Sequence, residues 1–201
     1  MTETLRALPR REEHVHAATQ GVADTTPTPL EMRQAMGTFA TGVTVVTGAD
    51  DGGPVGFACQ SFASVSLEPP LVLFCASHNG RAWPRIRKAG RFCVNVLGDQ
   101  QTDVCDRFGS IRGRKYDGLE WDLTRWGTPA LRDVLLQVHA EVHHVHAAGD
   151  HDVVIGRVLE LERGSDQRPM IYFRGSFGIE PGQPTPLPWV LEPREWGERW
   201  G

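Results

Sequence analysis

Alternating hydrophobic and polar positions divide the chain into short strands separated by turns. A β-branched run spans Val43 to Thr47, and the turn-forming residues Asp50-Asp51-Gly52-Gly53 follow it. Hydrophobic residues occupy every second position from Leu136 to Val142, which predicts a half-buried strand. By the same reasoning we expect further strands at residues 71–74, 91–97, 153–161 and 169–173.

A short helix is predicted before the first strand. It begins at the capping box Thr28-Pro29-Leu30-Glu31, with Thr as the N-cap and Glu three residues later. Met32, Met36 and Phe39 then fall on one face, and Gly42 is expected to end the helix.

Two more short helices are predicted within the strand-rich part of the chain. A polar loop over residues 75–84 leads into a helix with Ile86 on its apolar face, and residues 99–108 form the other. The six or seven strands are joined mostly by hairpins. We therefore expect a mainly β fold, an antiparallel β-barrel that is closed or nearly closed, rather than a doubly wound sheet.

One stretch within this pattern, Val55 to Phe74, differs from an ordinary pair of core strands. Its first half carries Ala, Cys, Gln and Ser where a buried strand would normally carry Val and Ile, and Pro69-Pro70 separates it from the apolar second half. Small side chains let a ligand approach the backbone, and Gln60, Ser61 and Ser64 offer polar groups. A binding strand and a tightly packed turn between two core strands both fit this composition.

Composition narrows the class of protein. The chain has 201 residues, 40% hydrophobic and 23% charged, with a net charge of −4, which is typical of one globular domain. The sequence pI of about 6.1 gives no indication of a nucleic-acid surface. There is no apolar run of about 18 residues and no hydrophobic signal-peptide core, so we expect no membrane span and a cytoplasmic location.

Cysteine usage and the two ends of the chain support the same expectation. The four cysteines, Cys59, Cys75, Cys93 and Cys105, lack CxxC spacing and are interpreted as reduced thiols. Residues 1–27 are expected to be a mobile leader, with His14 and His16 solvated. Residues 28–180 would form the domain, and residues 181–201 a tail rich in Pro and Trp.

Histidines form the first candidate site. His139, Glu141 and His143 share one face of a predicted strand, with His144 and His146 close behind, so a zinc site and a solvated strand face are the two interpretations. The chain has no HExxH, GxSxG, GxGxxG or P-loop sequence, which argues against those metal, nucleophile and nucleotide sites. His151 in Gly149-Asp150-His151 is either a surface turn residue or a catalytic one.

Five segments together resemble the short-chain flavin reductases, the reductase components of two-component flavin-dependent monooxygenases. The segments occur in the order typical of that family and span about residues 30–180. They are Met32 to Thr47, Gly56 to Phe74, Phe92 to Leu97, Gly149-Asp150-His151 with Gly156, and Pro169 to Gly175. The resemblance implies an FMN-binding split barrel of antiparallel Greek-key type that works as a homodimer.

The resemblance also implies a set of binding residues. FAD, or alternatively FMN, would bind along the strand that contains Val55, Gly56, Phe57, Ala58, Gln60 and Ser61. Phosphate contacts would come from Cys75, Ala76, Ser77 and Arg81, and further flavin contacts from Arg107 and Phe108. NADH would meet His151, the catalytic candidate, together with Arg168, Pro169, Met170 and Ile171. Many members of the family carry Thr where this chain has Ala58.

The implied activity is NAD(P)H:flavin oxidoreduction, in which hydride passes from nicotinamide C4 to flavin N5 and free reduced flavin goes to a partner monooxygenase. NADH is expected rather than NADPH, although Arg168 suits either pyrophosphate or a 2′-phosphate. No metal, nucleic acid or membrane is implied. Two rival functions fit the same barrel: an oxidoreductase that retains its flavin and reduces another acceptor, and a non-catalytic module that binds flavin or haem.

Overall fold

A computed structural model of the chain describes residues 25–110 and 114–177. The predicted leader, apart from residues 25–27, and the predicted C-terminal tail lie outside this part. Within it, no helix is long and apolar enough to cross a membrane.

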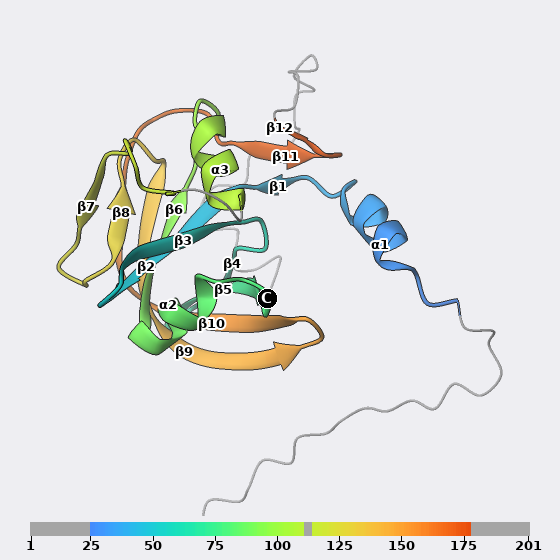
Figure 1. The fold of residues 1–201 in the computed structure, drawn as a ribbon, viewed down its shortest axis with the longest axis horizontal. Helices are drawn as coiled ribbons and strands as arrows, with labels where there is room; N and C mark the ends of the chain where they lie inside the picture. The colour runs from blue at the N-terminus through green and yellow to red at the C-terminus, as the bar shows by residue number, and fades with distance from the viewer. Residues whose placement is uncertain (1–24, 111–113, 178–201) are drawn as a thin grey trace, which may run out of the picture.

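A seven-stranded antiparallel sheet forms the body of the molecule (Figure 1). In sheet order the strands are β3 (Gly53–Cys59), β2 (Thr44–Asp50), β6 (Arg91–Val96), β9 (Leu136–Ala148), β10 (His151–Arg163), β5 (Pro70–Ser77) and β4 (Ala63–Leu67). Burial alternates along β5 and the first half of β10, which gives these strands one buried face, whereas β2 and β6 are buried at consecutive positions and therefore on both faces.

The sheet curls so that its two ends approach each other without forming a common ladder among the described residues. The Ser61 hydroxyl, just after β3, accepts a hydrogen bond of 2.8 Å from the Cys75 N–H of β5. The rings of Phe57 and Phe74 lie 6.0 Å apart across the same gap. The predicted mainly β, antiparallel fold with short inserted helices is therefore confirmed, and the barrel is split along this side.

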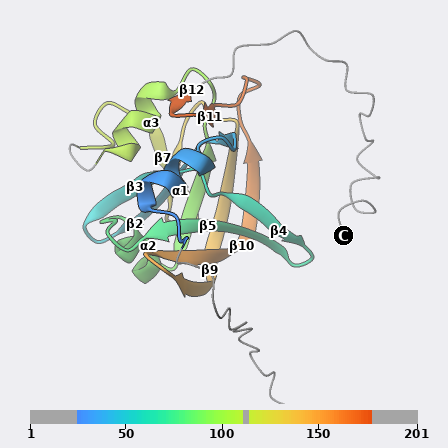
Figure 2. The same cartoon turned by 90° about the vertical axis from the view of Figure 1, so that its right-hand side faces the viewer.

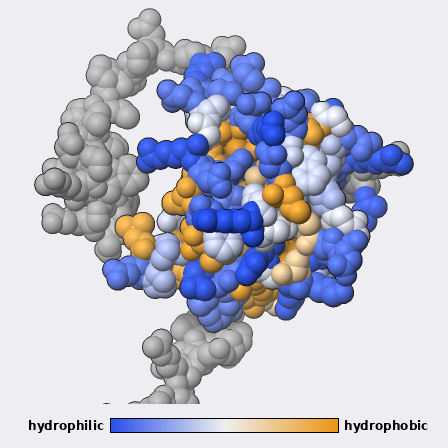
Figure 3. Space-filling view, turned by 90° about the vertical axis from the view of Figure 1, so that its left-hand side faces the viewer, coloured by the Kyte–Doolittle hydropathy of each residue, from blue (hydrophilic) through white to orange (hydrophobic). Residues whose placement is uncertain are grey.

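Two smaller sheets complete the β structure. Strands β1 (Thr41–Gly42), β11 (Ile171–Phe173) and β12 (Ser176–Phe177) form one at the top of the view in Figure 1. Strands β7 (Trp121–Leu123) and β8 (Pro129–Leu131) form a hairpin that packs against the main sheet. The face of the molecule on the β7 side is mostly hydrophilic, with smaller hydrophobic areas between the polar side chains (Figure 3).

Two short helices lie against the sheet, as predicted. Helix α2 (Trp83–Ala89) buries Ile86 completely, and helix α3 (Thr102–Gly109) buries Val104 and Phe108. Gly90 ends α2 with a left-handed backbone conformation, φ = 74°, which glycine adopts at little cost. The apolar side chains at helical spacing therefore fix which face of each helix contacts the core.

Helix α1 (Pro29–Met36) confirms the predicted capping box but differs from the prediction in two ways. The helix ends at Met36 with Gly37 as its C-cap, and Gly42 instead belongs to β1. Its apolar residues do not contact the core, because Met32 and Met36 are each more than half exposed and Phe39 beyond the helix is 67% exposed. In Figure 1 the helix stands apart from the sheet.

Two other local predictions were wrong. Residues 75–77, expected to belong to a polar loop, continue β5 because they pair with residues 151–153 of β10. The solvated strand face expected for His139 is covered by the β7–β8 hairpin, which is held by hydrogen bonds from Leu131 N–H to Asn95 and from Gln137 to the Leu131 carbonyl. His139 is therefore completely buried.

Candidate functional site

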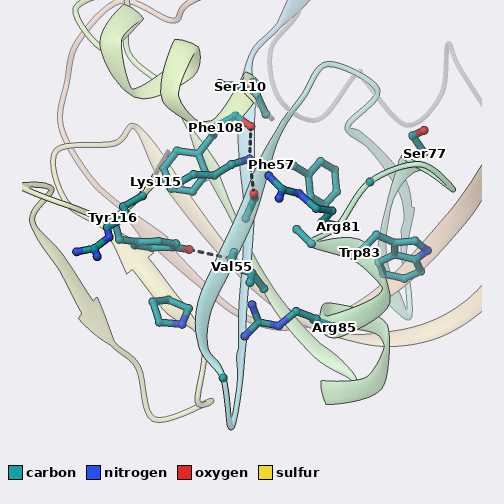
Figure 4. A pocket seen from close by; sticks show the side chains of 18 of the residues that line it. Val55, Phe57, Ser77, Arg81, Trp83, Arg85, Phe108, Ser110, Lys115 and Tyr116 are labelled. Atoms are coloured by element: carbon teal, nitrogen blue, oxygen red, sulfur yellow. Dashed lines mark hydrogen bonds between the residues drawn. The ribbon is translucent and has the colours of Figure 1, made fainter. Parts of the chain in front are cut away.

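A pocket of about 780 Å³ opens between β3, the segment that leads into α2, and the segment that follows α3 (Figure 4). Its volume lies within the range of small-molecule sites. The described lining residues fall into three groups by position: Gly52 and residues 54–58 of the β3 region; Ser77, residues 79–83 and Arg85; and residues 108–110 and 114–117.

The β3 wall owes its shape to small residues. A Cβ atom at Gly56 would lie 2.7 Å from the Phe108 ring and 2.9 Å from the Val46 carbonyl oxygen, so only glycine lets α3 approach β3 this closely. Since β3 is the end strand of the sheet in the described part of the chain, one edge of its backbone is not paired with another strand there, and residues 54–58 line the pocket. The small side chains and this free edge leave the β3 backbone accessible to a ligand.

Positive charge dominates the pocket. Among the described lining residues, Arg81, Arg85, Arg114 and Lys115 carry positive charge and Asp117 carries negative charge. Figure 4 shows Arg81 and Arg85 reaching toward β3 from the α2 side, with Lys115 and Tyr116 on the opposite side. Converging cations of this kind bind phosphate and other anions.

Lys115 and Tyr116 hold β3 in place from the α3 side. The Lys115 ammonium donates to the Gly56 carbonyl oxygen at 3.1 Å and to the Phe108 carbonyl oxygen at 2.8 Å. The Tyr116 hydroxyl donates to the Val55 carbonyl oxygen at 2.8 Å. Burial and, secondly, the charge of Arg81 lower the pKa of Lys115, whereas burial raises the pKa of Tyr116. Tyr116 therefore stays protonated and keeps donating this bond at neutral pH.

Arg85 is fixed by a carboxylate at the end of β2. Its Nε donates to an Asp50 carboxylate oxygen at 2.8 Å, and its Nη2 donates to the Gly53 carbonyl oxygen at 2.9 Å. Hydrogen bonding to Arg85 is the main reason that the pKa of Asp50 falls to about 2. The guanidinium thus enters the pocket in one orientation rather than as a mobile side chain.

The structure brings seven of the twelve flavin candidates together at this pocket. They are Val55, Gly56, Phe57, Ala58, Ser77, Arg81 and Phe108. The other five do not line it. Gln60 and Ser61 are exposed beyond the end of β3, Cys75 is half-buried and Ala76 is buried within β5. Arg107 is exposed and donates to the Asp117 carbonyl oxygen at 2.6 Å.

His151 lies at the first position of β10, paired directly with Ser77 of β5. Paired residues of antiparallel strands project to the same side of a sheet, so the imidazole lies beside a residue that lines the pocket. Its Nδ1 is 2.7 Å from an Asp150 carboxylate oxygen. Hydrogen bonding to His151 is the main cause that lowers the pKa of Asp150.

The other NADH candidates, Arg168 to Ile171, lie at a different end of the molecule. Arg168 pairs with Asp99 at 3.0 Å, Pro169 bridges to Gly98, and Met170 is buried beneath α3. Ile171 pairs with Gly42 in the β1–β11 sheet. Figures 1 and 2 place β11 at the opposite end from the β9–β10 turn that precedes His151. One chain therefore does not bring the two sets together.

The sequence reasoning missed the other described lining residues of the pocket, among them Trp83, Arg85, Arg114, Lys115 and Tyr116. Arg85 follows Trp83 by two positions at the start of a predicted helix. This position could have indicated from the sequence that Arg85 is a candidate site residue. Lys115 and Tyr116 gave no such signal, because they fall in a loop-rich segment that meets β3 only after folding.

The histidine candidates do not form a metal centre among the described residues, where no group of three or more His, Cys, Asp or Glu side chains converges. His139 Nε2 instead lies 3.0 Å from a Glu162 carboxylate oxygen. His143, His144 and His146 are exposed on β9.

The chain is similar to known flavin reductases over most of its length. The flavin reductase like domain profile matches residues 36–180. The reductase subunit HsaB of a flavin-dependent monooxygenase from Rhodococcus jostii is 47% identical over 162 residues, covering 80% of this chain and 83% of that protein. The crystal structure of nitrilotriacetate monooxygenase component B from Mycobacterium thermoresistibile is 44% identical with a TM-score of 0.73, covering 79% and 90% of the two chains.

Two further relatives are named for different flavins. The FMN reductase (NADH) SmoA from Agrobacterium fabrum is 38% identical over 146 residues, covering 73% of this chain and 83% of that protein. The NADH:FAD oxidoreductase SgcE6 from Streptomyces globisporus, in complex with NAD and FAD fragments, is 29% identical with a TM-score of 0.73, covering 77% and 94%. The resemblance found in the sequence is confirmed, and the chain belongs to the flavin reductase family.

Proposed function

We propose that this flavin reductase oxidises NADH, reduces FAD bound in the pocket beside β3, and releases the reduced FAD to a partner monooxygenase. The cationic lining of the pocket is the observation that carries the proposal. Four positively charged side chains surround an accessible backbone edge, which suits a ligand with a flat polar ring system and an anionic tail.

The distribution of the cations supports FAD over FMN. Arg81 and Arg85 belong to the α2 side of the pocket, whereas Arg114 and Lys115 belong to the α3 side. Positive charge spread over two walls suits an extended anionic group such as the FAD pyrophosphate. FMN remains the alternative, since relatives named for each flavin share the fold.

Bound flavin supplies the chemistry by accepting a hydride from NADH at N5. The β3 backbone would then orient the ring, and Arg81 would contact phosphate. Lys115, held in place by two carbonyl oxygens, adds a positive charge that favours a ring gaining electrons. His151 would position the nicotinamide from the neighbouring strand, which agrees with its place beside Ser77.

A homodimer is part of the proposal. The apolar residues Leu30, Met32, Met36 and Phe39 of the α1 region are between 52% and 67% exposed, and a second copy would remove them from water. A second copy would also offer a way to join His151 of one chain to Arg168–Ile171 of the other. HsaB is named as the reductase subunit of a flavin-dependent monooxygenase, and the solved structure is named as component B of a monooxygenase, which supports the proposed partner.

Loss of absorbance at 340 nm tests the proposal, with purified protein, NADH and either FAD or FMN in air. We expect consumption of NADH that depends on added flavin and saturates at lower concentration with FAD. NADPH in place of NADH is expected to react more slowly. No consumption with either flavin and either dinucleotide would contradict the proposed activity. A tightly bound flavin that does not exchange with added flavin would instead support an oxidoreductase that retains its flavin.

A further inference from the structure

The loop that carries Arg81 is held from both ends by one buried carboxylate, which belongs to Asp152 of β10. One carboxylate oxygen lies 3.0 Å from His78 Nε2, and the other accepts a hydrogen bond of 2.8 Å from the Trp83 indole N–H. The Arg81 loop, residues 78–82, begins at the first of these contacts and ends just before the second. Arg87, one turn along α2 from Trp83, donates to the same carboxylate at 3.2 Å.

The carboxylate is poorly accessible to water but well satisfied. The Asp152 side chain is only 8% exposed, and three donors from two neighbouring elements surround it. Hydrogen bonding to Trp83 and then to His78 lowers the pKa of Asp152, so it is ionised at neutral pH. Buried charges are stable only when they are paired in this way, and removing the carboxylate would leave Trp83 without its acceptor.

Trp83 transmits this contact to the pocket wall. Its indole is 3% exposed, lines the pocket and packs edge-on against Phe74 with ring centroids 5.8 Å apart. Phe74 in turn packs against Phe57 of β3, another lining residue. A change at Asp152 therefore reaches both the Arg81 loop and the aromatic wall, although Asp152 itself does not line the pocket.

We propose that Asp152 is a positioning residue for flavin binding, which fixes the Arg81 loop and Trp83 so that the Arg81 guanidinium is preorganised for the flavin phosphate. The inference rests on the proposed flavin site. It assigns no step of the hydride transfer to Asp152. A loop fixed before binding has less conformational freedom to lose when the ligand arrives, so affinity rather than turnover depends on it.

The chain offers a matched control on the same strand. Glu160 of β10 accepts a hydrogen bond of 2.8 Å from the Trp126 indole and is also bound by Arg125, but Glu160 and Arg125 line a different cavity. Asp152→Asn and Glu160→Gln therefore remove the same charge from two similar Trp–carboxylate–Arg contacts. Only one of these contacts is connected to the Arg81 loop.

The experiment is an equilibrium titration with FAD, followed by steady-state kinetics at saturating NADH. We expect Asp152→Ala to raise the FAD Kd by about tenfold, as lost hydrogen bonds to a buried charge imply, with kcat at saturating FAD nearly unchanged. Asp152→Asn should have a smaller effect, because its amide oxygen still accepts from Trp83. Glu160→Gln should leave the FAD Kd within about twofold of the wild-type value.

Trp83→Phe and Asp152→Asn keep the test decisive if Asp152→Ala folds poorly. Trp83→Phe retains a ring against Phe74 but removes the N–H, so it should weaken FAD binding. Its effect on the FAD Kd should be non-additive with that of Asp152→Asn. Unchanged FAD affinity in both single variants, or equal weakening by Glu160→Gln, would overturn the inference. Failure of the wild-type protein to bind FAD would instead contradict the proposed function.

Discussion

Two hollows on this molecule differ in charge although they are built in similar ways. The described lining of the pocket beside β3 holds four cations and one acidic residue. The second, of about 570 Å³ beside the β7–β8 hairpin, is lined by Asp122, Glu160 and Glu162 against Arg125. Strand β10 supplies a carboxylate bonded to a tryptophan indole next to each, at 2.8 Å in both cases.

The difference shows that a local contact does not reveal its function by itself. The Asp152 side chain is 8% exposed and joins two ends of a loop that carries a pocket cation. The Glu160 side chain is 29% exposed and is paired with Arg125 of the second hollow. The sign of the surrounding charge decides which hollow suits an anionic flavin, and only the first does.

Removing one arginine from each hollow should give the largest difference in FAD affinity between the two. Arg81→Ala is expected to raise the FAD Kd by about 30- to 100-fold, the usual loss for a charge-assisted hydrogen bond to phosphate. Arg125→Ala removes an arginine of the second hollow and should change the Kd by less than about twofold. Titration of FAD fluorescence measures both, and similar losses in the two variants would contradict the assignment of the flavin to the first hollow.

Packing of the β3 wall gives the next largest effect. In Gly56→Ala the new methyl group would clash with Phe108 and with the Val46 carbonyl group, so we expect a destabilisation of about 1–3 kcal/mol. Gly42→Ala is the control, because nothing lies within 4 Å of a Cβ at that position. Urea unfolding midpoints compare the two, and equal stabilities would show that α3 does not press on β3.

Replacing His151 should weaken the use of NADH without weakening the binding of FAD. His151→Ala is expected to raise the NADH KM by about tenfold and leave the FAD Kd nearly unchanged, because His151 lies beside the flavin pocket rather than in its lining. His146→Ala, an exposed histidine of β9, serves as the control. Equal losses for NADH and FAD in steady-state and titration measurements would contradict a role confined to the nicotinamide.

Lowering the pH should have the smallest effect, which is the loss of the stability that the ionised Asp50 carboxylate contributes. Because Arg85 depresses the pKa of Asp50 from 3.8 to about 2 in the folded state, the carboxylate stabilises the fold above about pH 4. This contribution is lost as the pH falls from about 4 to about 2. Urea midpoints of Asp50→Asn should therefore lie slightly below wild type at pH 7 and converge with it at pH 2. A constant difference across this range would disprove the linkage.

Local patterns in the sequence predicted much of the fold. The capping box at Thr28, the hairpin turn at residues 50–53 and the apolar spacing of α3 each depend on neighbours within a few residues. Seven of the flavin candidates that the family motifs implied line one pocket, and their role in flavin binding stays a prediction. These features need no knowledge of distant contacts.

Long-range contacts account for what the sequence did not reveal. His139 was expected on a solvated face or in a metal site, but a hairpin eight to eighteen positions earlier in the chain covers it. Lys115 reaches Gly56 across 59 positions and Tyr116 reaches Val55 across 61. The apolar side chains of α1 are exposed in a single chain. The local sequence pattern does not show what would cover them.

We propose above all that the cationic pocket beside β3 holds a phosphorylated flavin. The most direct test compares the equilibrium binding of FAD, FMN and riboflavin, which lacks phosphate, to wild-type protein and to Arg81→Ala. We predict that riboflavin binds wild type at least about tenfold more weakly than FAD, and that the gap narrows in Arg81→Ala. Equal affinity of wild type for riboflavin and FAD would contradict the claim.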